Sequence, residues 1–199
     1  MNKTGIAVFG GSFNPPTVAH IDLAKQILSK IDGIEKVIFV PVSTKYNKSG
    51  LAPDEVRLEF LKKICQNYSN IDVSDIELKS PKQPYTIETL RSIKEKYQDK
   101  NIYFVIGTDN LKELETWHEP EKVLTEFKII VLERNQDNAE QIIQNSLFLN
   151  KYKTSFFKID NIQKINLSSS FVREQIRMKK TIKGLVPEVI EEDVRRLYI

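Results

Sequence analysis

The chain contains only one cysteine among its 199 residues. A disulfide framework within the chain is therefore excluded, which fits a reducing compartment, and we expect the protein in the cytoplasm. Cys65 stands at helical spacing from Leu58 and Leu61, which indicates a small core residue rather than a nucleophile. The first strand-like run begins almost at Met1, so we expect no signal peptide ahead of it.

Long apolar runs and a concentration of charge are also missing from the sequence. No apolar stretch approaches the length needed to span a bilayer, so we expect no membrane segment. The net charge is only +3, and the lysines are mixed with acids along the chain, which argues against nucleic acid as the main partner. The length suits a full hydrophobic core, and we expect residues 1–199 to form a single domain.

What the sequence does contain is a regular alternation of strand-like and helix-like patterns. Such alternation predicts an α/β fold, a doubly wound parallel sheet with helices on both faces. Sheets of this kind bind ligands at the carboxyl ends of their strands, so the loops that follow strands are the candidate sites. The expected strands are residues 6–9, 37–40, 71–73, 102–106, 129–132 and 156–159. The expected helices are residues 18–29, 54–65, 86–97, 111–116, 121–127, 139–149, 170–178 and 187–198.

The most informative loop follows the first expected strand and reads GGSFNPPTVAH, residues 10–20. Gly10 and Gly11 let the backbone turn sharply and pass close to a ligand. The helix begins after Thr17, and backbone N–H groups at a helix N-terminus can bind phosphate. His20 lies three positions after Thr17, so both side chains can share one helix face and hold one phosphate. A polar N-cap followed by a partly buried histidine is the alternative explanation.

A second candidate anion site lies near the other end of the sequence, at residues 168–173, SSSFVR. A serine that caps a helix is the commoner explanation of such a segment. The functional addition is Arg173, one turn into the helix, whose guanidinium would converge with the hydroxyls of Ser169 and Ser170 on one anion. We therefore expect residues 166–199 to form a C-terminal helical part that carries a second phosphate-binding motif.

A third candidate follows the central strand, in IGTDN, residues 106–110. Gly107 permits close approach of a ligand, and Asp109 suits a ribose hydroxyl, although an ordinary turn and helix cap explains both. Trp117 can stack on a pyridine or purine base, and packing is the alternative. We interpret His118 as a bystander.

Two weaker candidates complete the set. Thr86 is expected to cap a helix, and the N–H groups at that helix start could bind a carboxylate. Lys48, in the loop after the second strand, could reach a phosphate, but a solvated lysine is the commoner state.

In this order and spacing, the segments resemble the nicotinate or nicotinamide mononucleotide adenylyltransferases. These are nucleotidyltransferases built on a Rossmann-like dinucleotide-binding fold. Residues 17–20, TVAH, match the family's first motif, with Ala19 in place of a glycine. Residues 168–173 match its closing motif, with Ser170 in place of a threonine. The resemblance covers nearly the whole chain.

The resemblance implies an enzyme of NAD biosynthesis that moves AMP from ATP to nicotinate mononucleotide, giving deamido-NAD and pyrophosphate. It implies Mg²⁺ as a cofactor, carried mainly by the ATP phosphates rather than by a protein metal site. The implied catalytic residues are His20, Thr17 and Arg173. The implied ATP-binding residues are Gly10, Gly11, Ser12, Phe13, Gly107, Asp109, Ser169 and Ser170. The implied mononucleotide-binding residues are Lys48, Tyr85, Thr86 and Trp117.

Three other functions stay open at this point. The acceptor could be nicotinamide mononucleotide, alone or beside nicotinate mononucleotide, although N–H groups near Thr86 favour the acid. The chain could be a phosphopantetheine-type adenylyltransferase, against which Trp117 and the Tyr85–Thr86 segment argue. It could also be a nucleotide-binding regulator without catalysis, against which the presence of His20 and Arg173 argues.

Overall fold

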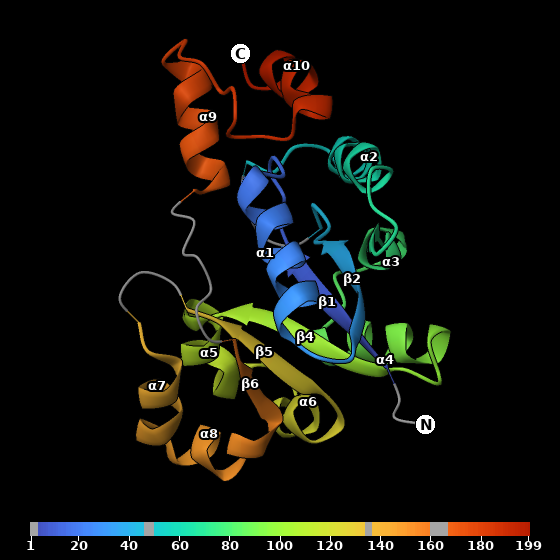
Figure 1. Ribbon diagram of the computed structural model, residues 1–199, viewed down its shortest axis with the longest axis vertical. Helices are drawn as coiled ribbons and strands as arrows, with labels where there is room; N and C mark the ends of the chain where they lie inside the picture. Colours follow the sequence, from blue (N-terminus) through green and yellow to red (C-terminus); the bar gives the residue numbers. More distant parts are fainter. Residues whose placement is uncertain (1–3, 46–49, 134–136, 160–166) are drawn as a thin grey trace.

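The computed structural model describes residues 4–45, 50–133, 137–159 and 167–199. Within these residues six strands form one sheet in the order β3-β2-β1-β4-β5-β6, and every neighbouring pair is parallel. Helices cover both faces of the sheet (Figure 1). The expected α/β fold with a doubly wound parallel sheet is confirmed, and the strand order is the one found in dinucleotide-binding folds.

The helices and strands alternate along the chain as the sequence pattern predicts. The strands are β1 (Gly5–Gly11), β2 (Ile34–Pro41), β3 (Ile71–Val73), β4 (Asn101–Gly107), β5 (Lys128–Leu132) and β6 (Phe156–Lys158). The helices are α1 (Val18–Lys30), α2 (Asp54–Cys65), α3 (Ile76–Lys79), α4 (Thr86–Lys96), α5 (Thr108–Glu113), α6 (Pro120–Glu126), α7 (Ala139–Asn145), α8 (Leu147–Lys151), α9 (Ser169–Arg177) and α10 (Glu188–Leu197). Two short 3₁₀ turns are η1 (Leu114–Thr116) and η2 (Lys153–Ser155).

Three elements differ from the expectation. Helix α3 lies in a segment expected to be a loop. The helix expected at 139–149 is divided in two, because the hydroxyl of Ser146 accepts the Leu149 N–H and starts α8 as a new helix. Helix α5 begins earlier than expected, directly after Gly107, which ends β4 and caps the helix with extended backbone.

Alternate residues of the central strands feed two hydrophobic clusters, one on each face of the sheet. Phe9 and Phe39 belong to the first cluster, with α1 and α2, whereas Val8 and Ile38 belong to the second, with α4, α5 and α6. Residues of α9 and α10, among them Val172, also belong to the first cluster. The C-terminal helices therefore share the core of the sheet, which is buried on both faces as parallel sheets are.

The strand order places a topological switch point between β1 and β4. Chain connections run from β1 to β2 and β3 on one side, and β4 leads to β5 and β6 on the other (Figure 1). Gly11 and Gly107 end the two strands that flank this point. Open α/β sheets bind ligands in the crevice at such a point, and both predicted glycine turns lie there.

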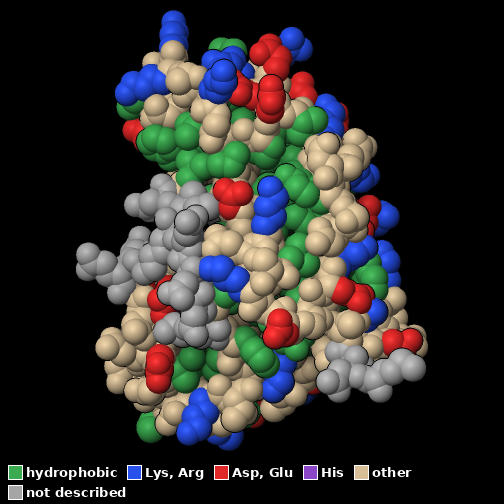
Figure 2. Space-filling view, viewed as in Figure 1, with side chains coloured by type: hydrophobic (Ala, Val, Ile, Leu, Met, Phe, Trp, Pro, Cys, Tyr) green, Lys and Arg blue, Asp and Glu red, His purple; other side chains and the backbone are tan. Residues whose placement is uncertain are grey.

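The surface agrees with the even distribution of charge in the sequence. On the face shown in Figure 2, Lys and Arg side chains are interspersed with Asp and Glu side chains. Among the described residues, no helix combines the length and the apolar character that crossing a membrane requires.

We predict that Leu61→Ala lowers the free energy of unfolding by about 2–5 kcal/mol, because it truncates a fully buried side chain and leaves a cavity in the first cluster. The matched control is Leu147→Ala, since that leucine is 96% exposed, and its effect should stay within about 0.5 kcal/mol. Urea unfolding followed by circular dichroism measures both values. Equal effects in the two variants would contradict the assignment of the core.

Candidate active site

The first loop joins β1 to α1 and holds His20 in one orientation. The backbone N–H of Thr17, which caps α1, donates to Nδ1 of His20 over 2.9 Å, and the Thr17 hydroxyl lies 2.9 Å from the same nitrogen. Because Nδ1 accepts a hydrogen bond, a neutral imidazole carries its proton on Nε2. Thr17 is fully buried, so its hydroxyl is placed to orient the ring. His20 is thereby set up as a donor through Nε2.

The floor beneath His20 is aromatic. The ring of Phe13 is buried and makes edge contacts with His20 and Phe9, at centroid distances of 5.0 and 6.1 Å. Phe13 has a left-handed backbone with φ of 45°, a strained conformation for a side chain of this size, and the burial of its ring offsets that strain. A Cβ atom at Gly11 would lie 3.1 Å from this ring, so glycine lets the ring fold back under the loop. Phe13 can therefore offer a ligand only its backbone.

The start of α1 is less open to an anion than the sequence indicates. The N–H of Val18, the first residue of the helix, donates to the carbonyl of Leu185 over 3.1 Å. This donor is used by the chain itself. The Val18 N–H is therefore not among the donors that the predicted anion site could use.

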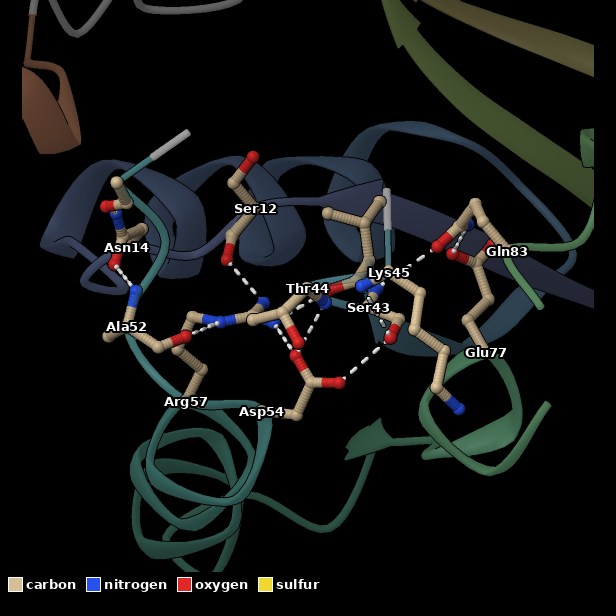
Figure 3. Close-up of polar contacts among 12 residues, drawn as sticks. Ser12, Asn14, Ser43, Thr44, Lys45, Ala52, Asp54, Arg57, Glu77 and Gln83 are labelled. Carbon is tan, nitrogen blue, oxygen red and sulfur yellow. Dashed lines mark hydrogen bonds and ion pairs between the residues drawn. The ribbon is translucent and has the colours of Figure 1, made fainter. Parts of the chain in front are cut away.

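A buried arginine that the sequence reading missed holds the first loop against the loop after β2. The side chain of Arg57, in α2, is 0% exposed. Its guanidinium donates to the carbonyls of Ala52, Ser12 and Val42 over 2.9, 2.8 and 2.6 Å, and to the carboxylate of Asp54 over 2.5 Å (Figure 3). One charged group thus links the carboxyl ends of β1 and β2 to the start of α2.

The contacts continue from Asp54 toward α4. Asp54 accepts from the Ser43 hydroxyl over 2.8 Å, and the Ser43 N–H donates to the side-chain carbonyl of Gln83 over 3.2 Å (Figure 3). The Gln83 amide in turn donates to the buried carboxyl of Glu77 over 2.7 Å, and Thr89 donates to the same carboxyl over 2.8 Å. These hydrogen bonds join Ser43, which follows β2, to the start of α2 on one side and to the segment before α4 on the other.

The pKa values of the two carboxyl groups in this network, Glu77 and Asp54, are shifted in opposite directions. Burial raises the pKa of the Glu77 carboxyl, while the hydrogen bonds from Gln83 and Thr89 act against that rise. Burial also acts to raise the pKa of Asp54, but hydrogen bonds from Ser43 and from the Thr44 backbone, together with the charge of Arg57, hold it below its ordinary value. Asp54 is therefore the ionised partner of the buried guanidinium.

The second predicted motif lies directly against the first loop. The hydroxyl of Ser169 donates to the carbonyl of Pro15 over 2.7 Å. Arg173 donates to the carbonyl of Asn14 over 2.6 Å and to the Ser170 hydroxyl over 3.1 Å. The cap of α9 is Ser168, whose hydroxyl accepts the N–H of Phe171, so the expected serine cap is confirmed. The structure thus brings the two motifs together.

On the other side of the switch point, Gly107 caps α5 and Asp109 lies exposed in its first turn. Trp117 follows η1 and is partly buried against the second cluster, with its ring edge-on to Phe104 at 6.1 Å. Packing and a ligand contact are both compatible with this half-buried position.

The start of α4 meets the segment after η1 through two rings. Tyr85 is 51% exposed and stacks on His118, which we interpreted as a bystander, with a centroid distance of 3.9 Å. Tyr85, not Thr86, is the cap of α4, which corrects the expected cap by one residue. The sequence signal for Thr86 as a cap was its hydroxyl, but Glu88 instead accepts the Tyr85 N–H over 2.8 Å. Lys48 lies outside the described residues.

Of the structural features not predicted from the sequence, the buried Arg57 had a recognisable sequence pattern. Arg57 stands at helical spacing with Phe60, Leu61 and Ile64, the buried face of α2. A charged residue on an apolar stripe points to an internal partner. The stack of Tyr85 on His118 had no such signal, because it joins segments far apart in the sequence.

The two predicted motifs together place hydrogen-bond donors and a cationic side chain near the switch point between β1 and β4. His20, Ser169, Ser170 and Arg173 converge around one loop. In the part of the chain that the structure describes, no group of three His, Cys, Asp or Glu side chains could hold a metal ion. A doubly wound sheet with such donors at the carboxyl ends of its strands is typical of a nucleotide-binding α/β protein.

Comparison with known proteins specifies the family. A family model described as Cytidylyltransferase-like matches residues 8–175. Relatives named "Probable nicotinate-nucleotide adenylyltransferase" occur in Clostridium acetobutylicum, with 32% identity over 97% of this chain and 98% of the relative, and in Fusobacterium nucleatum, with 33% identity over 98% of both chains. The chain belongs to the cytidylyltransferase-like family and, within it, to the nicotinate-nucleotide adenylyltransferases.

Solved structures share the fold. Nicotinic acid mononucleotide adenylyltransferase of Plasmodium falciparum, complexed with NaAD, superimposes with a TM-score of 0.74 and 24% identity over 98% of both chains. The same protein complexed with APC gives a TM-score of 0.73 and 23% identity. The overall fold of this chain is thus shared with these two structures.

We predict that Arg57→Lys lowers the free energy of unfolding by about 3 kcal/mol or more, because an ammonium group cannot reach the four acceptors of the planar guanidinium and leaves buried carbonyls unpaired. The matched control is Arg91→Lys, since Arg91 pairs with Glu126 at the surface, and its cost should be at most about 1 kcal/mol. Urea unfolding of both variants tests the difference, and similar costs would contradict the stabilising role assigned to the hydrogen bonds of Arg57.

Proposed function

We propose that this protein transfers AMP from ATP to nicotinate mononucleotide, which forms deamido-NAD and releases pyrophosphate, as a step of NAD biosynthesis. The single observation that carries the proposal is the docking of the α9 start on the first loop, where Ser169 and Arg173 contact the backbone beside His20. Family membership supports the same activity, because relatives that match nearly the whole chain are named as probable nicotinate-nucleotide adenylyltransferases. We also propose that residues 1–199 act as one nucleotidyltransferase domain, supported by the core that α9 and α10 share with the sheet.

The reaction needs positioning rather than a protein nucleophile. An oxygen of the mononucleotide 5′-phosphate forms a bond to the α-phosphorus of ATP, and the bond from that phosphorus to the bridging oxygen of the β-phosphate breaks. The attacking phosphate is already an anion near neutral pH, so no general base is required. Catalysis then consists of holding the two phosphates in line and stabilising the shifted charge, which donors and cations accomplish.

His20 supplies the central donor in this proposal. With Nδ1 occupied by the Thr17 N–H, the Nε2–H is the group that would hold an α-phosphate oxygen of ATP. Thr17 contributes by fixing the ring through its backbone and hydroxyl, and the edge of Phe13 supports the ring from below. The donor is thus oriented before substrate arrives, which is the condition for efficient stabilisation of charge.

The leaving pyrophosphate would be held from the opposite end of the chain. Nη1 and Nη2 of Arg173 each donate one hydrogen bond within the chain, and the other N–H groups of the guanidinium would hold phosphate oxygens. The hydroxyls of Ser169 and Ser170 lie beside it at the start of α9. MgATP is the form of the substrate that we propose, with the ion carried mainly by the phosphates and keeping most of its waters.

The bases and riboses would occupy the two sides of the switch point. For ATP we propose the backbone of residues 10–13, with Gly107 and Asp109 at the adenosine ribose. For the mononucleotide we propose Trp117 and Tyr85 at the pyridine ring, with Thr86 at the start of α4 near its carboxylate and Lys48 at its phosphate. We propose the cytoplasm as the setting, supported by the single cysteine, which is buried in the core.

We predict that His20→Ala and His20→Asn each lower kcat/KM by about 100-fold or more, the usual effect of losing one oriented donor to the transition state. Asparagine can still accept the Thr17 N–H, whereas glutamine places its amide nitrogen near the position of Nε2. His20→Gln should therefore keep more activity than His20→Asn at similar stability. Steady-state assays and thermal unfolding of the three variants test this order, and a fully active His20→Ala enzyme would remove the mechanism.

The activity itself is tested by pyrophosphate release from MgATP with nicotinate and nicotinamide mononucleotides as parallel acceptors. We predict turnover when both MgATP and a pyridine mononucleotide are present. We expect a higher kcat/KM for nicotinate mononucleotide, because its carboxylate can accept hydrogen bonds from N–H groups at the start of α4. Phosphopantetheine is the negative control. A reversed ratio would move the specificity to the amide, and ATP binding without pyrophosphate release would favour a regulator.

A further inference from the structure

Asn14 stands where three distant segments of the chain meet. It lies in the first loop and is 3% exposed. Its backbone carbonyl accepts Arg173 of α9 over 2.6 Å, as described above. Its side chain makes a separate set of contacts with the loop after β2 and with the segment that follows α10.

The side-chain amide of Asn14 is used at both ends. Its nitrogen donates to the carbonyl of Gly50 over 2.9 Å, and its oxygen accepts the N–H of Ala52 over 2.9 Å. The same oxygen accepts the hydroxyl of Tyr198 over 2.5 Å. An amide has one donor side and one acceptor side, so these partners fix its orientation without ambiguity.

Tyr198 is suited to donate this hydrogen bond permanently. It ends α10 as the cap residue, and its ring packs partly buried against the first cluster. Burial raises the pKa of its hydroxyl to about 12, with the charges of Arg173 and Arg57 acting in the opposite direction. The hydroxyl therefore keeps its proton at physiological pH, and both arginines lie close enough to influence it.

We propose that Tyr198 is a positioning residue for adenylyl transfer, which acts through Asn14 to hold the first loop in its working geometry. The proposal rests on the function proposed above. Asn14 directly follows Phe13, the support of His20, and its own carbonyl and that of Pro15 accept the hydrogen bonds from Arg173 and Ser169. A change in the orientation of Asn14 would shift both phosphate-binding motifs relative to each other, while the pyridine side of the crevice, near Tyr85 and Trp117, would keep its own contacts.

Tyr198→Phe removes one hydroxyl and keeps the packing of the ring. We expect kcat to fall about three- to tenfold, the effect of one hydrogen bond expressed in the barrier, with KM for nicotinate mononucleotide nearly unchanged. The matched control is Tyr68→Phe, because Tyr68 is also partly buried against the first cluster. Thermal unfolding verifies that both variants are folded at the assay temperature. A merely structural role would lower stability without changing kcat far below the melting temperature.

A double-mutant cycle tests whether the effect passes through Asn14. In an Asn14→Ala background, which has no acceptor, Tyr198→Phe should cause no further loss of kcat. In an Asn14→Asp background, which keeps an oxygen acceptor, Tyr198→Phe should still lower kcat, and this second background serves if Asn14→Ala does not fold.

The outcomes separate the two proposals. A wild-type chain without turnover would overturn the proposed function and this inference with it. An active wild type in which Tyr198→Phe equals Tyr68→Phe would overturn the inference alone, as would an equal loss of kcat from Tyr198→Phe in the wild-type and Asn14→Ala backgrounds.

Discussion

The buried guanidinium of Arg57 is the constraint on which the ligand side of the structure depends. It donates to carbonyl groups that directly follow two adjacent strands, Ser12 after β1 and Val42 after β2, in partly buried surroundings. The loop after β1 and the residues directly after β2 are thereby joined to α2 through one side chain. Its charge is compensated by Asp54, whose other hydrogen bonds extend the same rigid arrangement toward Glu77. A polar network of this kind orders loops where hydrophobic burial cannot, because every member has a partner.

The buried ring of Phe13 and the guanidinium of Arg57 hold the same part of the first loop from opposite sides. Phe13 directs its ring into the core and leaves only its backbone at the crevice, while Arg57 holds the carbonyl of the residue before it. The loop is therefore constrained by an apolar side chain below and a charged side chain beside it. This explains how the ring of His20 is oriented, with Nδ1 held by the Thr17 N–H.

Much of this architecture could be predicted from local patterns. The alternation of strands and helices gave the sheet class, and α2 and β3 have the expected bounds, because short apolar runs and amphipathic spacing are properties of neighbouring residues. The division at Ser146 and the cap at Tyr85 were missed, since they depend on single hydrogen bonds that compete with equally good local alternatives. The meeting of both phosphate motifs was expected only through the family resemblance. The partners of Arg57 and Asn14 could not be predicted, because they are fixed by contacts between loops that share no sequence pattern.

The link from Tyr198 to Asn14 spans 184 positions in the sequence, and that from Arg173 to the same residue spans 159. Contacts of such separation form late, because the chain between them must be closed first. On the ribosome, a nascent chain that already contains β1 to β5 has the strands of the sheet but not the groups that hold the first loop from the C-terminal side. The contacts that hold the first loop from the C-terminal side can therefore form only after α9 and α10 have been synthesised.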